Sequence, residues 1–373
     1  MPTPKIIDLF AGAGGFSLGA HLAGFSPALA IEIDQDLGYS RALNFPGTKT
    51  LYADLATLDP ADALKEANLA PGEVAGIIGG PPCQGYSVMG ERDPEDKRNA
   101  LVGRFFEYVA VIRPAFFIME NVPGILTDAL RFHLDDGLQR VSSAYSIVGP
   151  MILDAQDFGA ATARERAVVI GYRPDRIAPI TAADLRTNGT GPATVRDAIS
   201  DVPRPNVAER DAAGNSWGRY NPGARDLLPY ARRARRPPPK GLAAEIVRQA
   251  HRAGRVSGIQ PTRHSPAVLA RFEALQPGEI DHVSKYPRLR WDEVCKTLRA
   301  GTGRDRGSFQ AARPIHPEEH RVITVREAAR IQGFPDWFQF HPAIWHSFRM
   351  IGNSVSPYMA ETLLSRVSER LGD

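Results

Sequence analysis

The chain has only two cysteines, Cys83 and Cys295, and it lacks any apolar segment long enough to cross a bilayer. Two cysteines are too few for a cysteine-rich zinc site, so we expect no structural metal. The apolar stretch 6–10 near the start is shorter than the apolar region of a secretory signal peptide. These absences exclude a membrane-spanning protein, and we expect a cytoplasmic one.

Strong net charge is also absent, because the formal total is only +3, but the charges are unevenly distributed. Residues 204–313 contain 22 Lys and Arg against 10 Asp and Glu, whereas the rest of the chain contains 23 against 32. A local positive excess of this size is typical of a phosphate-binding surface, although such runs also form ordinary solvated faces.

The 373 residues, 43% of them hydrophobic, are enough for one large core and a second, smaller domain. Apolar runs alternate with helical stretches, which predicts a doubly wound, parallel α/β sheet. We expect its strands at 5–10, 28–33, just before Asp54, and at 74–78, 115–119, 145–148 and 167–171.

The amino-acid composition changes after Gly171, where the sequence becomes rich in Pro, Arg and Gly. Helical patterns return at 324–332 and at 355–371. We therefore predict a sheet domain made of residues 1–173 plus 318–373, interrupted by a smaller, loop-rich domain at 174–317.

Cys83 lies in a loop built from Gly and Pro, residues 79–87, directly after the apolar segment 74–78. In open α/β sheets, active sites form where the strands end. A helix N-terminus or a nearby Arg or Lys can favour the thiolate of a cysteine held there. Cys83 is therefore predicted to be a nucleophile, with a buried structural cysteine as the alternative.

This loop, together with the later triplet Glu120, Asn121 and Val122, resembles the cytosine-C5 methyltransferases. The resemblance runs from Asp8 to Pro357, with the family's blocks in order. It implies a Rossmann-like S-adenosylmethionine-dependent methyltransferase domain with an inserted target-recognition domain. It further implies methyl transfer to carbon 5 of cytosine in double-stranded DNA, with S-adenosylhomocysteine as the product.

The segment 10–15 has glycines where the backbone must turn sharply and approach a ligand. Glu32, at the end of the next strand, can accept hydrogen bonds from ribose hydroxyls; a solvated strand end is the alternative. The resemblance assigns Glu32 to the ribose of S-adenosylmethionine, Ile33 to the adenine ring and Asp54 to the adenine amino group. The other cofactor contacts that it implies are Phe10, Gly12, Gly14, Pro81 and Asn353.

Carbon 5 of cytosine is too weak a nucleophile to attack a methyl sulfonium, so a nucleophile must first add to carbon 6. In this interpretation Cys83 adds, and Glu120 relieves the electron density at N3 as an acid. The resemblance places Arg166 at the cytosine O2 and gives Arg164 a supporting role beside it. Ala161 and Thr162 stand where the family usually has Pro and Gln, which leaves the geometry of this loop open.

A base inside a duplex cannot present carbon 6 to a thiol, so the target must be flipped out. The polar segment 84–99 suits a loop that closes over DNA, with an ordinary surface loop as the alternative. Its predicted DNA contacts are Gln84, Ser87 and Arg98. In the insert we expect Arg232 and Arg233 to bind phosphate and Arg304 and Arg306 to read bases.

Two other functions are compatible with parts of this sequence. A transfer-RNA cytosine-5 methyltransferase typically has Pro-Phe-Thr after the Gln and a Cys-Phe-Thr motif, whereas here Gly85, Tyr86 and Ser87 follow and Cys295 precedes Lys296. Intact Cys83 argues against a non-catalytic DNA-binding relative. We expect a monomer, with any cognate restriction endonuclease or defence-system protein acting separately; the sequence does not reveal the recognition site.

Overall fold

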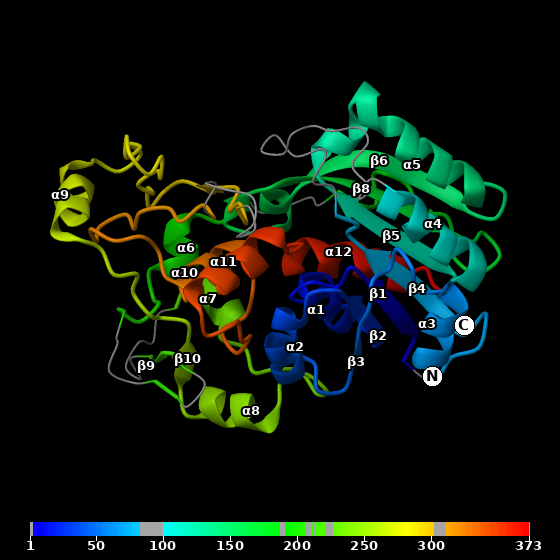
Figure 1. The fold of residues 1–373 in the computed structure, drawn as a ribbon, viewed down its shortest axis with the longest axis horizontal. Helices are drawn as coiled ribbons and strands as arrows, with labels where there is room; N and C mark the ends of the chain where they lie inside the picture. Colours follow the sequence, from blue (N-terminus) through cyan, green and yellow to red (C-terminus); the bar gives the residue numbers. More distant parts are fainter. Residues whose placement is uncertain are drawn as a thin grey trace.

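The computed structural model describes residues 3–82, 100–186, 191–205, 210–211, 214–220, 227–301 and 311–372. Its centre is a seven-stranded sheet with the order β3-β2-β1-β4-β5-β8-β6 (Figure 1). The strands are β1 (Lys5–Leu9), β2 (Ser26–Glu32), β3 (Lys49–Tyr52), β4 (Val74–Gly79), β5 (Phe116–Asn121), β6 (Ser146–Asp154) and β8 (Glu165–Tyr172).

The pairing from β3 through β5 is parallel, but β8 runs antiparallel between β5 and β6. The prediction of a parallel sheet is therefore wrong at β8. Residues 155–164, which join β6 to β8, contain only the short helix η5 (Ala155–Phe158) and the short strand β7 (Thr162–Ala163). A parallel crossover needs a dozen or more residues, usually a helix, so this link returns the chain in the opposite direction.

Both faces of the sheet are covered by helices, which explains why its strands are continuously apolar. Successive side chains of a strand point to opposite faces. Ile6 and Phe116 accordingly belong to one core, and Ile7 and Phe117 belong to the other. The first core includes α1 (Gly15–Leu22) and α12 (Pro357–Ser368), and the second includes α3 (Pro60–Glu66), α4 (Ala100–Ile112) and α5 (Asp128–Val141).

Helix α12 packs directly on α1, so the two ends of the chain meet in one layer (Figure 1). A Cβ placed on Gly19 would lie 2.4 Å from the Cβ of Ala360, so the helices approach closely there because Gly19 has no side chain. The C-terminal helical patterns are observed at α12 and at α10 (Val325–Gln332). Thr324 caps α10 in a capping box with Glu327, and Gly333 ends it in the left-handed region.

The remaining elements lie mostly beside the sheet, at the left of Figure 1. They are short and include small two-stranded pairings, β10-β9 and β11-β7. These elements are α6 (Val195–Ile199), β9 (Trp217–Arg219), α7 (Pro229–Ala234), α8 (Glu245–Arg252), β10 (Arg255–Ser257), α9 (Pro266–Ala274), β11 (Cys295–Lys296) and α11 (Ile344–Asn353). No helix in the described ranges is long and apolar enough to span a membrane.

Candidate active site

The beginning of the cysteine loop is held by the triplet that follows it in the sequence. Cys83, Gln84, Ser87 and Arg98 lie outside the described residues, which stop at Pro82 and resume at Ala100. The side-chain amide of Asn121 donates to the carbonyl oxygen of Pro81 at 3.1 Å, and its own oxygen accepts from the N–H of Val122 at 2.8 Å. Because β4 and β5 are parallel neighbours, these bonds fix Pro81, at the beginning of the loop, at the sheet's carboxyl edge.

Glu120 and Arg166 form an ion pair at this edge, with 2.7 Å between Oε1 of Glu120 and Nε of Arg166. Each side chain is only 11% exposed. A Cβ placed on Gly80 would lie 2.9 Å from the other carboxylate oxygen of Glu120. The carboxylate therefore lies between Arg166 and the start of the cysteine loop, which brings together two of the predicted catalytic residues.

Arg164 lies two residues before Arg166, but it has different partners. Its guanidinium is buried and donates to the carbonyl oxygen of Gly352 at 2.8 Å and, more weakly, to that of Leu298 at 3.4 Å. Its backbone N–H donates to Asp154 at 2.6 Å. These contacts fit a supporting residue, as the resemblance implied, better than a catalytic one.

Glu32 connects the glycine loop to the end of β2. One of its carboxylate oxygens accepts from the N–H of Gly12 at 2.8 Å, and the other accepts from the N–H groups of Ile33 and Asp34, both at 2.9 Å. A carboxylate has about four acceptor positions, so room remains for a hydroxyl donor. Ile33 is 65% exposed, so its side chain is available to pack against a flat ring.

The other predicted cofactor residues are in the glycine loop, at the end of a strand or helix, or after β4. Phe10, at φ 56°, and Gly12, at φ 53°, are in the left-handed region, and Gly14 is the N-cap of α1 without a side-chain cap. A Cβ on Gly15 would lie 2.3 Å from the carbonyl oxygen of Val355, so the turn after Asn353 packs on the loop. Asp54 and Asn353 are exposed, and Pro81 is buried.

This arrangement fits S-adenosylmethionine: an acceptor carboxylate, an exposed apolar side chain and a tight glycine turn at a helix N-terminus lie together at one sheet edge. No cluster of metal-ligating side chains occurs in the described part of the chain.

Sequence reasoning missed the buried groups under the glycine loop. Arg41, on α2 (Gly38–Asn44), donates to the carbonyl oxygen of Gly12 at 3.3 Å and to the hydroxyl of Ser17 at 3.4 Å. That hydroxyl donates to Asp8. Burial raises the pKa of Asp8 to about 6, against the lowering effects of Arg41 and Ser17. An acid inside the apolar strand 5–9 was a signal for this cluster; nothing in the sequence around Arg41 marked it.

The model of the family described as C-5 cytosine-specific DNA methylase matches residues 4–369. This chain belongs to that family. It is 35% identical to the Type II methyltransferase M.XorII of Xanthomonas oryzae pv. oryzae, over 100% of this chain and 86% of that protein. It is 33% identical to M.DdeI of Desulfomicrobium norvegicum, over 98% and 88% of the two chains.

Solved structures agree with this assignment. An E. coli prophage-encoded chain, a candidate DNA modification methyltransferase, superposes with a TM-score of 0.86 and 36% identity, covering 98% of this chain and 99% of its own. The S. pombe Dnmt2 methyltransferase, with a TM-score of 0.62 and 16% identity over 98% of both chains, shares the fold. The present chain is thus a DNA (cytosine-5)-methyltransferase.

The unusual residues Ala161 and Thr162 are both fully buried in this methyltransferase. Ala161 donates to the carbonyl oxygen of Ile331 at 3.1 Å and accepts from the N–H of Cys295 at 3.0 Å. The segment 161–163, which includes β7, therefore contacts both α10 and the insert just before Arg164 and Arg166. Burial raises the pKa of the Cys295 thiol to about 12, so this second cysteine is not a nucleophile near neutral pH.

The arginines predicted to bind phosphate differ in their surroundings. Arg232 is exposed, and its Nε donates to the carbonyl oxygen of Leu227 at 2.9 Å. Arg233 instead pairs with Glu361 at 2.6 Å and stacks on Tyr358, its guanidinium carbon 3.5 Å from the ring centroid. Arg233 thus holds α7 against α12 in the methyltransferase. Arg304 and Arg306 lie outside the described residues.

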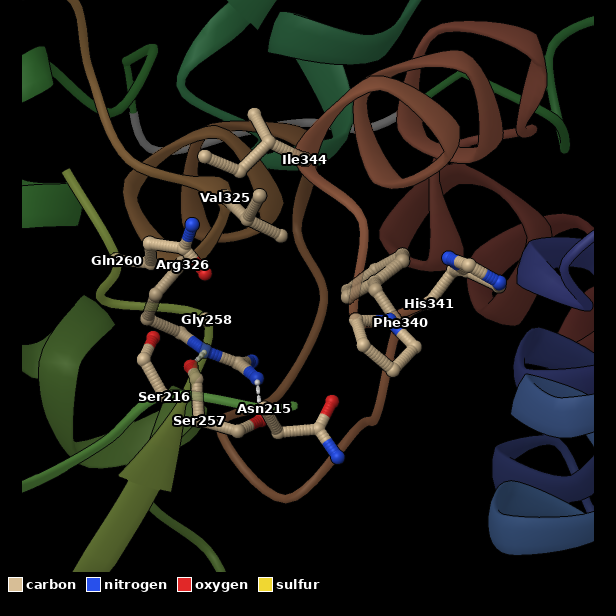
Figure 2. A pocket seen from close by; sticks show the side chains of 11 residues that line it. Asn215, Ser216, Ser257, Gly258, Gln260, Val325, Arg326, Phe340, His341 and Ile344 are labelled. Carbon is tan, nitrogen blue, oxygen red and sulfur yellow. Dashed lines mark hydrogen bonds between the residues drawn. The ribbon is translucent and has the colours of Figure 1, made fainter. Parts of the chain in front are cut away.

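Figure 2 shows a pocket that is separate from these groups, lined by Ser216 and Ser257 from the insert and by His341. Arg326 also lines it, but its guanidinium donates to the carbonyl oxygens of Ser257 at 2.9 Å and Phe338 at 2.7 Å. None of the predicted site residues lines this pocket. We therefore do not assign the substrate to it.

Proposed function

We propose that this methyltransferase transfers a methyl group from S-adenosylmethionine to carbon 5 of a flipped-out cytosine in a specific double-stranded DNA sequence, through a covalent adduct with Cys83. The observation that carries the proposal is the Glu120–Arg166 pair, 2.7 Å apart beside the start of the Cys83 loop. A buried acid and a buried guanidinium at a strand edge are suited to gripping one polar edge of a base.

In this proposal, the Cys83 thiolate forms a bond to carbon 6, and the electron pair displaced from the 5,6 double bond makes carbon 5 nucleophilic. Glu120 donates a hydrogen bond or proton to N3, and Arg166 donates to O2. Bound S-adenosylmethionine supplies an electrophilic methyl group on sulfur. Loss of the carbon 5 proton then expels the thiolate and restores the aromatic ring, now carrying the methyl group.

The cofactor would be held by Glu32 at the ribose, by Ile33 and Asp54 at the adenine, and by the loop 10–15 and Asn353 at the methionine part. We propose that residues 1–173 and 318–373 form the catalytic domain and that residues 174–317 select the target. The protein would act as a monomer on duplex DNA, in a restriction-modification or phage-defence system; the relatives' names, Type II methyltransferases, support the restriction-modification role.

The test is to give the purified protein S-adenosylmethionine labelled in the methyl group, with duplex DNA or with transfer RNA. Bisulfite sequencing of DNA from expressing cells then locates the modified base. We expect label in DNA alone and protected cytosines within one short sequence. Label in transfer RNA alone would support the RNA alternative, and no label in either would refute the proposed function.

A further inference from the structure

Arg164 joins three segments that the proposed function assigns to different tasks. It follows β7 directly and precedes β8, which carries Arg166. Its guanidinium donates to the carbonyl oxygen of Leu298, a few residues before the predicted base readers Arg304 and Arg306. It also donates to the carbonyl oxygen of Gly352, next to Asn353. One side chain, located between β7 and β8, therefore contacts both the segment before the predicted base readers and the segment that ends at the predicted cofactor residue Asn353.

The burial of Arg164 calls for an explanation. The side chain is 2% exposed, and its Nε has no hydrogen-bond partner among the residues that the structure describes. Burial and the neighbouring Arg166 lower the pKa of Arg164 well below its usual value. Burying a charged guanidinium whose hydrogen bonds go to backbone carbonyls costs folding free energy. An apolar side chain of similar volume is often more stable at a buried position. Packing alone therefore does not account for an arginine at this position.

The three segments also contact one another around Arg164. The hydroxyl of Thr297 donates to the carbonyl oxygen of Ala163 at 2.6 Å, and β11 pairs with β7. A Cβ placed on Gly352 would lie 2.5 Å from the backbone nitrogen of Ala300. Residues 299–300 and Gly352, near the end of α11, are thus in backbone contact, and a shift of either segment moves an acceptor of Arg164.

We propose that Arg164 is a positioning residue that couples DNA binding to cofactor binding. The inference rests on the proposed function, because it takes Asn353 as part of the cofactor site and Arg304 and Arg306 as part of the DNA site. A ligand that fixes one of these segments fixes the other through the shared guanidinium. Such a coupling is reciprocal: each ligand tightens the other by the same factor.

The experiment measures the Kd of a duplex containing the site mapped by bisulfite sequencing, with and without saturating S-adenosylhomocysteine, which binds without turnover. For the unmodified enzyme we expect the product to tighten DNA binding by about fivefold or more, the lower end of typical allosteric couplings. Arg164→Met keeps the volume but removes the donors, and the tightening should fall below about twofold. Arg164→Lys, with one donor group, should keep part of it.

Arg288 offers a matched control. It is also buried, and within the described part of the chain its guanidinium donates only to backbone carbonyls, those of Phe272, Leu275, Pro317 and Glu318, none of which lies in the segment that ends at Asn353. Arg288→Met should lower the melting temperature and leave the coupling factor unchanged. If Arg164→Met does not fold, Gly352→Ala tests the same junction from the other side, since its new Cβ must displace Ala300.

The inference is overturned if the unmodified enzyme shows no coupling. It is overturned equally if Arg164→Met, or Gly352→Ala in its place, retains the full factor, or if Arg288→Met loses as much. Failure of the proposed function has a different signature, the absence of methyl transfer to DNA by the unmodified enzyme.

Discussion

The catalytic edge of the sheet and the basic insert use arginine in different ways. At the sheet edge, Arg166 lies 2.7 Å from Glu120, whose other carboxylate oxygen lies next to Gly80 at the start of the cysteine loop. In the insert, Arg235 pairs with Asp201 at 2.6 Å, and Arg233 pairs with Glu361. In the proposed function the arginine of the first region binds the target base, whereas these arginines of the second hold the protein's own elements together.

The same is true elsewhere in the insert. Arg271 pairs with Asp281 at 3.0 Å, and Arg248 donates to the carbonyl oxygens of Pro238 and Leu242 at 3.2 and 2.6 Å. An excess of positive charge counted from the sequence therefore overstates the charge available to DNA phosphates. Short motifs at strand ends predict a site better, because the strand fixes where their side chains lie.

The largest effect that would sharpen this comparison is expected at Cys83. Cys83→Ala should abolish methyl transfer, because it removes the group that adds to carbon 6 in the proposed mechanism, while DNA binding survives, since binding depends on the insert. Steady-state turnover and a DNA gel-shift assay measure the two properties. Near-normal turnover of the variant would refute a covalent mechanism.

The next largest effect is expected at Glu120. Glu120→Gln keeps the volume and one hydrogen-bond donor but cannot transfer a proton, so single-turnover methyl transfer should slow by about 10²-fold or more. The apparent affinity for S-adenosylmethionine should change little, because only the transition state loses stabilisation. Weak cofactor binding with a near-normal chemical step would make this carboxylate a structural partner of Arg166.

Much of the fold could be predicted because buried parallel strands appear as continuous apolar runs. The direction of β8 could not, since such a run has the same pattern in either direction. Asn353 is the last residue of α11, and residues 354–356 connect it to α12. Ser356 is the N-cap residue of α12, but its hydroxyl donates to the carbonyl oxygen of Gln332 at 3.0 Å, a contact that local sequence patterns do not predict.

The site was predictable in its parts but not in its contacts. Glu120 and Arg164 were each identified from a motif, yet the partners of Arg164 come from Leu298 and Gly352, far along the chain. Local patterns carry no information on such long-range packing. The internal pairing of Arg233 was missed for the same reason, because its partner Glu361 lies on α12.

A smaller effect is expected in the cofactor pocket. Ile33→Ala removes an exposed side chain, so folding should be unaffected, while the lost contact with adenine costs about 1 kcal/mol, or roughly fivefold in the KM for S-adenosylmethionine. The turnover number and the KM for DNA should stay the same. Ile246, 68% exposed on α8, offers a control: Ile246→Ala should leave all three constants unchanged.

The smallest effects are expected within residues 232–236 of the insert, where two arginines are exposed and two are paired. Arg232 and Arg236 are exposed, so replacing both with Ala should flatten the salt dependence of DNA binding, by about one unit of slope per lost phosphate contact, without loss of stability. Replacing Arg233 and Arg235 should instead lower the melting temperature by a few degrees. The opposite assignment of the two phenotypes would mean that the paired arginines serve DNA after all.

The most direct test of the central claim uses a duplex in which 5-fluorocytosine replaces the target cytosine. Fluorine replaces the carbon 5 hydrogen that must be removed as a proton before the thiolate can be expelled. The adduct should therefore persist after methyl transfer. With S-adenosylmethionine present, we predict a denaturation-resistant protein–DNA complex whose linkage maps to Cys83 by mass spectrometry, and none with Cys83→Ala. A complex that maps elsewhere, or full methylation of normal DNA with no trapped complex, would contradict the account.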